Sequence, residues 1–163
     1  MDAKRFAGYL NDHLSGSEAA TKVADRLIGE HGDDEIGVFM RRFREELDQE
    51  RAAIRTALDL LGEDESMLGR TVGMVGGMLT WARDVAPIGS APSLLEDLEA
   101  LAVGVWGKRL LWGTLGRATS YDARFAVIDA DHLAAQAEDQ ERMLLRLRGD
   151  EIERGLRLGD TAA

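Results

Sequence analysis

Residues 93–115 form the one long stretch of this sequence whose helical pattern is apolar around most of its circumference. Its middle, residues 100–107, carries no charge, while Glu99 precedes it and Lys108 and Arg109 follow it. A helix that is apolar on nearly all sides has to be surrounded by other helices. The sequence therefore predicts a helical bundle organised around this segment.

Helix breakers are rare in the chain, because both prolines, Pro87 and Pro92, fall in residues 85–93. Before and after that segment, apolar residues recur every three to four positions, which is the period of a helix. Glycines and capping residues mark the ends. We predict a first helix ending near Gly32, a second from Asp33 or Asp34 to Gly62, a third over residues 66–85, a fourth from Ser93 and a fifth from Ser120 through Leu147.

The connection lengths predict how these helices are arranged. Short turns make the first and second helices one antiparallel hairpin and the fourth and fifth another, and the third helix would run back between them. The predicted fold is all-α, a ferritin-like four-helix bundle of two antiparallel hairpins with a short fifth helix in the long crossover. An alternating five-helix array has the same helix directions. We expect one domain over residues 1–163, with a frayed tail over 149–163 where glycines recur.

Composition excludes several classes of function. The formal net charge is -10 and the isoelectric point about 4.8, which disfavours nucleic acid and anionic membranes as partners. The chain has no cysteine, so thiolate and disulfide chemistry is excluded. No apolar run is long enough to span a membrane, and Asp12 and His13 interrupt the place of a signal peptide. We therefore expect a cytoplasmic protein.

The predicted third helix carries three glycines spaced by four, Gly69, Gly73 and Gly77, followed by Trp81. Such spacing puts the glycines on one side of a helix, where another backbone can approach closely. We interpret these four residues as an interface, and the protein as a homodimer. The alternative is a loosely formed connecting helix, since glycine weakens helices.

Near their middles, the four long helices carry groups that can bind a metal or hydrogen-bond. Ser17, Gln136 and Asp139 are among them, and the candidate metal ligands are His13, Glu46, Glu50, Glu99 and His132. Buried carboxylates and imidazoles have to be paired or metal-bound. Oxygen and imidazole ligands suit iron or manganese, as in di-iron and di-manganese carboxylate bundles.

The pattern of such sites is nevertheless incomplete. No Glu-x-x-His pair occurs, and Asp129 with His132 is only a shortened imitation of one. An internal salt-bridge network accounts for the same residues, with Glu50 and Glu99 facing cations of residues 51, 108 or 109 and the two histidines. We favour this network over a metal centre.

Several segments resemble an uncharacterised group of bacterial proteins with a ferritin-like bundle. They are Tyr9–Leu14 with Gly16 and Ser17, Glu46 with Glu50 and Arg51, Leu98–Leu101 with Gly104, Gly107–Arg109 with Leu111 and Trp112, and Ala137–Gln140. The resemblance implies a fold and no specific activity, and ferritin-like relatives at large oxidise or store iron.

Taken together, the sequence predicts a non-enzymatic ferritin-like bundle that acts through association of helix faces, without an identifiable small-molecule substrate. The alternative is a bundle that binds iron or manganese and has oxidase activity.

Overall fold

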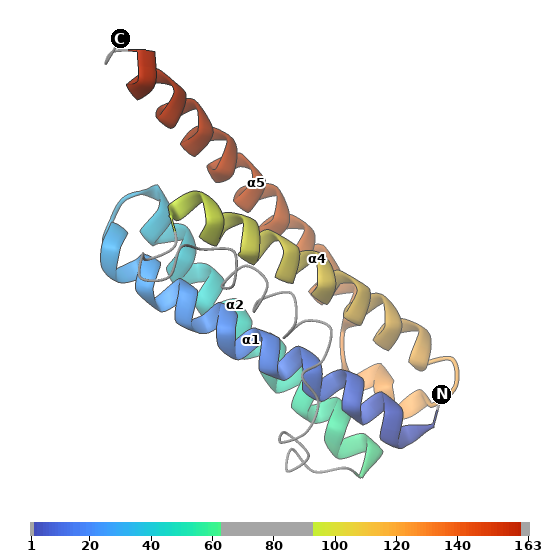
Figure 1. Cartoon of the computed structure of the whole chain (residues 1–163). Coiled ribbons are helices and arrows are strands. Elements are labelled where there is room, and N and C mark those ends of the chain that lie inside the picture. Colours follow the sequence, from blue (N-terminus) through green and yellow to red (C-terminus); the bar gives the residue numbers. More distant parts are fainter. Residues whose placement is uncertain (1, 63–92, 161–163) are drawn as a thin grey trace.

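The chain is mostly helical in the part that the computed structural model describes, residues 2–62 and 93–160, with side chains as far as residue 157. Four long helices and one short 3-10 helix account for nearly all of it (Figure 1): α1 (Ala3–His31), α2 (Glu35–Leu61), α4 (Leu94–Ala118), η2 (Ala123–Val127) and α5 (Ala130–Asp160). No strand occurs in these residues. The all-α prediction is confirmed for them.

The turn between α1 and α2 follows the predicted signals. Gly32 ends α1 with a positive φ of 53°, and its N–H donates to the Ile28 carbonyl oxygen at 3.0 Å. The Asp34 side chain then caps α2 by accepting from the N–H groups of Ile36 and Gly37, at 2.9 and 3.0 Å. Gly37 packs directly against the turn, since a Cβ there would overlap the Gly32 carbonyl oxygen. This contact makes the turn tight.

The predicted start of α4 is also confirmed. The Ser93 hydroxyl accepts from the Glu96 N–H at 3.3 Å, and the Ser93 N–H donates to the Glu96 carboxylate at 2.6 Å. Both halves of a capping box are therefore formed. At the other end of the first hairpin, Gly62 closes α2 in the left-handed conformation, with φ of 70°.

The helices pack as two hairpins placed side by side. α1 packs on α2 and α4 packs on α5, while α1 also contacts α4 and α2 contacts α5. Figure 1 shows that α2 and α4 run in the same direction, as the sequence predicts. An ion pair ties the hairpins together: Arg26 on α1 donates to the buried Asp97 carboxylate on α4 at 2.6 Å. The largest fully buried side chains are Trp112, Phe43, Leu10, Leu27, Met40, Leu58, Leu98, Leu111, Leu115 and Leu144.

The last helix differs from the prediction at both ends. It begins at Ala130 instead of Ser120, because Asp122 caps η2 first and the Asp129 carboxylate then accepts from the His132 N–H at 3.0 Å. It also continues to Asp160, past the point where we predicted fraying, and its end extends beyond the other helices in Figure 1. Ion pairs one turn apart, such as Arg157 with Glu153, support this exposed extension.

The predicted third helix, with Gly69, Gly73, Gly77 and Trp81, lies outside the described residues. In the part of the chain that is described, no helix is long and apolar enough to cross a membrane.

Candidate functional site

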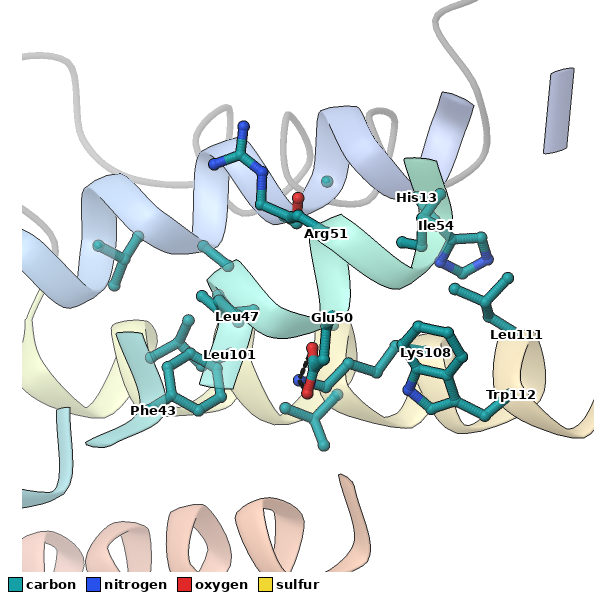
Figure 2. Close-up of a pocket in the computed structure, with 17 residues that line it drawn as sticks. His13, Phe43, Leu47, Glu50, Arg51, Ile54, Leu101, Lys108, Leu111 and Trp112 are labelled. Carbon is teal, nitrogen blue, oxygen red and sulfur yellow. Dashed lines mark hydrogen bonds and ion pairs between the residues drawn. The ribbon is translucent and has the colours of Figure 1, made fainter. Parts of the chain in front are cut away.

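The centre of the bundle holds a buried ion pair between Glu50 of α2 and Lys108 of α4. The Lys108 ammonium donates to both Glu50 carboxylate oxygens, at 2.8 and 2.6 Å, and the two residues are only 2% and 8% exposed. Figure 2 shows the two side chains pointing toward each other from their helices. The salt-bridge network predicted from the sequence is therefore confirmed for this pair.

Amide groups of α5 complete the surroundings of the carboxylate. Gln136 donates to Glu50 at 3.1 Å and Gln140 donates to it at 3.3 Å. Gln140 also donates to Glu46 at 2.6 Å, so it joins the two carboxylates of α2. Because hydrogen bonds to a buried carboxylate replace lost hydration, this arrangement stabilises the charge.

The environment of Lys108 has opposing effects on its charge. Burial lowers the pKa of the Lys108 ammonium below its usual value, and the nearby Glu50 carboxylate opposes this shift. The ammonium also lies over the Phe43 ring, 5.1 Å from its centroid, a favourable cation–π distance. Each charge therefore compensates for the burial of the other, since either one left alone in this interior would be strongly unfavourable.

A cleft opens beside the ion pair, between α1 and α4 with α2 as its floor. Its free space is about 650 Å³ with the solvent at its mouth included. The walls are mainly apolar, and the polar side chains among them are His13, Ser17, Glu50, Arg51, Lys108 and Trp112. Small residues line the cleft from both helices, and their short side chains leave room between α1 and α4. They are Gly16 and Ala20 on α1 and Ala100 and Gly104 on α4.

His13 lies at one end of this cleft, near Leu111 and Trp112 (Figure 2). Burial lowers the pKa of its imidazole to about 4, so the ring is neutral at pH 7. Its ring meets Tyr9 edge-on, with centroids 4.7 Å apart. A neutral imidazole in this position contributes polarity to the cleft and no charge.

The five candidate metal ligands are not brought together. Glu46 and Glu50 both accept a hydrogen bond from Gln140, and His13 lines the same cleft as Glu50. Glu99 is instead exposed and accepts from Arg148 at 2.7 Å. His132 is exposed in the first turn of α5. Among the described residues, no three His, Asp or Glu side chains gather closely enough to hold a metal ion.

The displacement of Glu99 and His132 has simple causes. Glu99 follows the buried Leu98 by one position, which turns it about 100° away from the core. His132 is three residues after Asp129, and this spacing serves the helix cap, because the carboxylate accepts from the backbone of His132. The expectation that both residues join the central polar layer is therefore corrected.

Two contributors to the centre were not chosen from the sequence as site residues. Gln140 is completely buried and bonds both carboxylates. Its signal was its position on the apolar stripe of α5, between Ala137 and Leu144. Trp112 is also buried, and its indole N–H is unpaired among the described residues.

The outer face of α4 forms a second candidate site. Although the sequence predicted a helix surrounded by others, Trp106 is 51% and Leu110 53% exposed, and Val103 is exposed beside them. Spacings of three and four put these residues on one face. Leu145 of α5 is also exposed. We call these four residues the α4 face.

Ion pairs between α4 and α5 border the α4 face at both ends. Arg148 pairs with Glu99 at one end, and Arg109 pairs with Glu138 and Glu141 at the other. Residues 138, 141, 145 and 148 follow helical spacing, so Leu145 lies between the two sets of pairs. The apolar residues therefore form one patch with a charged border.

No protein-family model, no curated protein and no solved structure matches this chain.

Proposed function

We propose that this protein is a non-enzymatic, ferritin-like helical bundle that works by associating with a second copy of itself through the α4 face. The helix directions support the ferritin-like part of the proposal. α2 and α4 run parallel (Figure 1), and a bundle of two antiparallel hairpins then needs one long connection between them. Residues 63–92 are the chain available for that connection.

The observation that carries the association is the α4 face itself. Single exposed apolar residues are common on protein surfaces, whereas a contiguous apolar patch with a polar border is typical of an interaction site. Trp106 stands near its centre, and tryptophan is enriched among the residues that dominate binding energy. Three of its residues lie on α4 and Leu145 lies on the neighbouring α5, so a second copy can present the same face across a two-fold axis.

The size of the patch predicts weak association. Burying the exposed halves of three aliphatic residues contributes about 1 kcal/mol each, and burying that of Trp106 about 2 kcal/mol. Two copies would therefore gain roughly 10 kcal/mol. Association itself costs at least about 4 kcal/mol, which leaves at most about 6 kcal/mol, or a dissociation constant of tens of micromolar.

Light scattering coupled to size-exclusion chromatography tests this proposal over about 10 to 200 µM, the range that this affinity requires. We expect the mass to rise with concentration toward that of a dimer. Trp106→Glu should abolish the rise, because it places a charge in the middle of the buried patch. Val38→Glu is the matched control, since Val38 is equally exposed, at 53%, but lies on α2.

Two results would contradict the proposal. One is a monomer at every concentration, which rejects self-association. The other is a dimer that Trp106→Glu leaves intact and Val38→Glu disrupts, because the contact would then involve α2 instead of the α4 face.

A further inference from the structure

We infer that the cleft between α1 and α4 binds a small amphipathic carboxylate, whose apolar body lies along the cleft and whose carboxylate accepts from unpaired donors in its walls. This inference does not depend on the association proposed above. It follows from three properties of the cleft: its shape, its charge and the hydrogen-bonding groups that lack partners.

The shape suits an extended apolar chain. On α1 the lining runs from His13 to Val23, ten residue steps or about 15 Å of helix. Apolar side chains from three helices form most of the wall, with Leu47, Ile54 and Val105 among them. Pockets for small molecules in proteins are commonly lined in this apolar way, with a few polar groups that fix orientation.

The charges in the cleft leave a positive excess. Glu50 and Lys108 neutralise each other at 2.6 Å, and His13 is neutral at pH 7 because burial lowers its pKa to about 4. Arg51 is the remaining charged group of the lining, and its only described ion pair, with Glu18, is long at 3.6 Å. An anion would therefore be favoured over a cation.

Two buried polar atoms of the lining have no partner among the described residues, and both are donors. Neither the Trp112 indole N–H nor the Arg51 Nε–H finds an acceptor among the described residues, although both atoms are buried. Trp112 as a whole is only 1% exposed, and a buried donor without a partner is costly. The Glu50 oxygens already accept four hydrogen bonds, from Lys108, Gln136 and Gln140. The two buried donors therefore lack an acceptor, which a carboxylate supplies.

Calorimetric titration with three probes of equal chain length tests the chemistry of the ligand. The probes are octanoate, octanol and octylamine, added to the full-length protein at pH 7. We expect octanoate to bind at one site, octanol to bind about tenfold more weakly, and octylamine more weakly still. Equal affinity for all three would overturn the inference, because the cleft would then select only for apolar surface. No heat with octanoate would overturn it as well.

Filling the cleft locates the binding. A Cβ built on Gly104 meets no atom of the described residues within 4 Å, so the leucine of Gly104→Leu has room to enter the cleft. Replacing a helical glycine also favours the helix. We expect this variant to bind octanoate at least about tenfold more weakly while its melting temperature is kept or raised. Gly29→Leu is the control, since Gly29 is equally open but exposed on α1, away from the cleft.

Two outcomes of this experiment would contradict the inference. If Gly104→Leu binds octanoate like the native protein, the ligand sits elsewhere. If Gly104→Leu is strongly destabilised and the native protein does not bind octanoate, another part of this chain already occupies the cleft.

The donors are tested by a variant and by a spectroscopic signal. Arg51→Gln should weaken octanoate binding several-fold and leave octanol binding unchanged, whereas Arg41→Gln, on the exposed side of α2, should affect neither. In ¹H–¹⁵N spectra, the indole N–H signal assigned by Trp112→Phe should move downfield when octanoate is added, because it gains an acceptor. Octanoate binding with an unmoved Trp112 signal and an unchanged Arg51→Gln affinity would refute the assignment of these donors.

Discussion

The buried pair of Glu50 and Lys108 gives the sharpest prediction about stability. Lys108→Met removes an ammonium that donates to both Glu50 oxygens, at 2.8 and 2.6 Å. Gln136 and Gln140 still donate to one oxygen, at 3.1 and 3.3 Å, so the carboxylate keeps part of its solvation. Leaving one member of a buried pair alone costs about 3–5 kcal/mol. We expect the lower end, about 3 kcal/mol, because of these amides.

A double-mutant cycle separates the attraction within the pair from the cost of a single buried charge. Glu50→Met strands the Lys108 ammonium and should also cost about 3 kcal/mol. The double variant Glu50→Met/Lys108→Met removes both charges at similar volume. It should lie within about 2 kcal/mol of the native protein, because Gln140 keeps its bond to Glu46 at 2.6 Å. The coupling between the two positions would then be about 4 kcal/mol or more.

Urea unfolding at pH 7, followed by circular dichroism at low protein concentration, measures these free energies. The slopes of the transitions should agree, so that midpoints report stability. Arg109→Met is the matched control. It is the next residue in α4 and its pairs with Glu138 and Glu141 are solvent-accessible, so it should destabilise the protein far less than Lys108→Met. A Lys108→Met cost below about 1 kcal/mol, or a double variant as unstable as the two singles added, would refute the reasoning.

Three further predictions concern His13, the first turn and the start of α4. As pH falls from 6.5 toward 4, the free energy of unfolding of the native protein should drop by up to roughly 3 kcal/mol relative to that of His13→Gln. The pKa of His13 in the folded state is lowered to about 4, so only the unfolded state takes up the proton in this range. Urea midpoints across this range measure the drop, and parallel pH curves for the two proteins would contradict it. Gly37→Ala should destabilise the protein by about 2 kcal/mol or more, because the added Cβ would overlap the Gly32 carbonyl oxygen. Gly29→Ala should instead stabilise it by about 1 kcal/mol, because Gly29 is helical and a Cβ there has space. Equal melting temperatures of the two variants would refute this contrast. Ser93→Ala should cost about 1 kcal/mol by removing the hydroxyl that caps α4, which thermal unfolding would show, and an unchanged midpoint would mean the cap contributes nothing.

The helix ends were predictable because single residues determine them locally. Gly32 and Gly62 both have positive φ, and Ser93 with Glu96 forms a capping box, so these boundaries depend on side chains within a few positions of the break. The start of α5 was misplaced because Ser120 and Asp129 are both acceptable helix caps. The structure uses Asp129 after a 3-10 segment that local signals do not reveal.

The candidate site was predictable only where a polar residue lies on the buried stripe itself. Glu50 and Lys108 follow the stripes of α2 and α4, and both are buried. Glu99 was placed inward from its position beside the uncharged centre, but it is one residue off the stripe and lies in solvent. Which stripe residues meet across helices depends on the relative shift of the two hairpins, and a one-dimensional pattern does not contain that shift.

The central polar groups suggest what determines that shift. Apolar contacts alone tolerate sliding of one hairpin along the other, because leucines in neighbouring turns are interchangeable partners. The bonds from Lys108 and Gln140 to Glu50 are satisfied at only one setting, since a slide of one turn, about 5.4 Å, would leave the carboxylate buried and alone. Glu50→Met/Lys108→Met should therefore keep most of its stability yet lose uniqueness. We expect broadened, poorly dispersed ¹H–¹⁵N signals for α4 in this variant. Native-like sharp signals would show that the register is set without the central pair, by apolar packing and the remaining bonds of Asp97 and Glu46 between the hairpins.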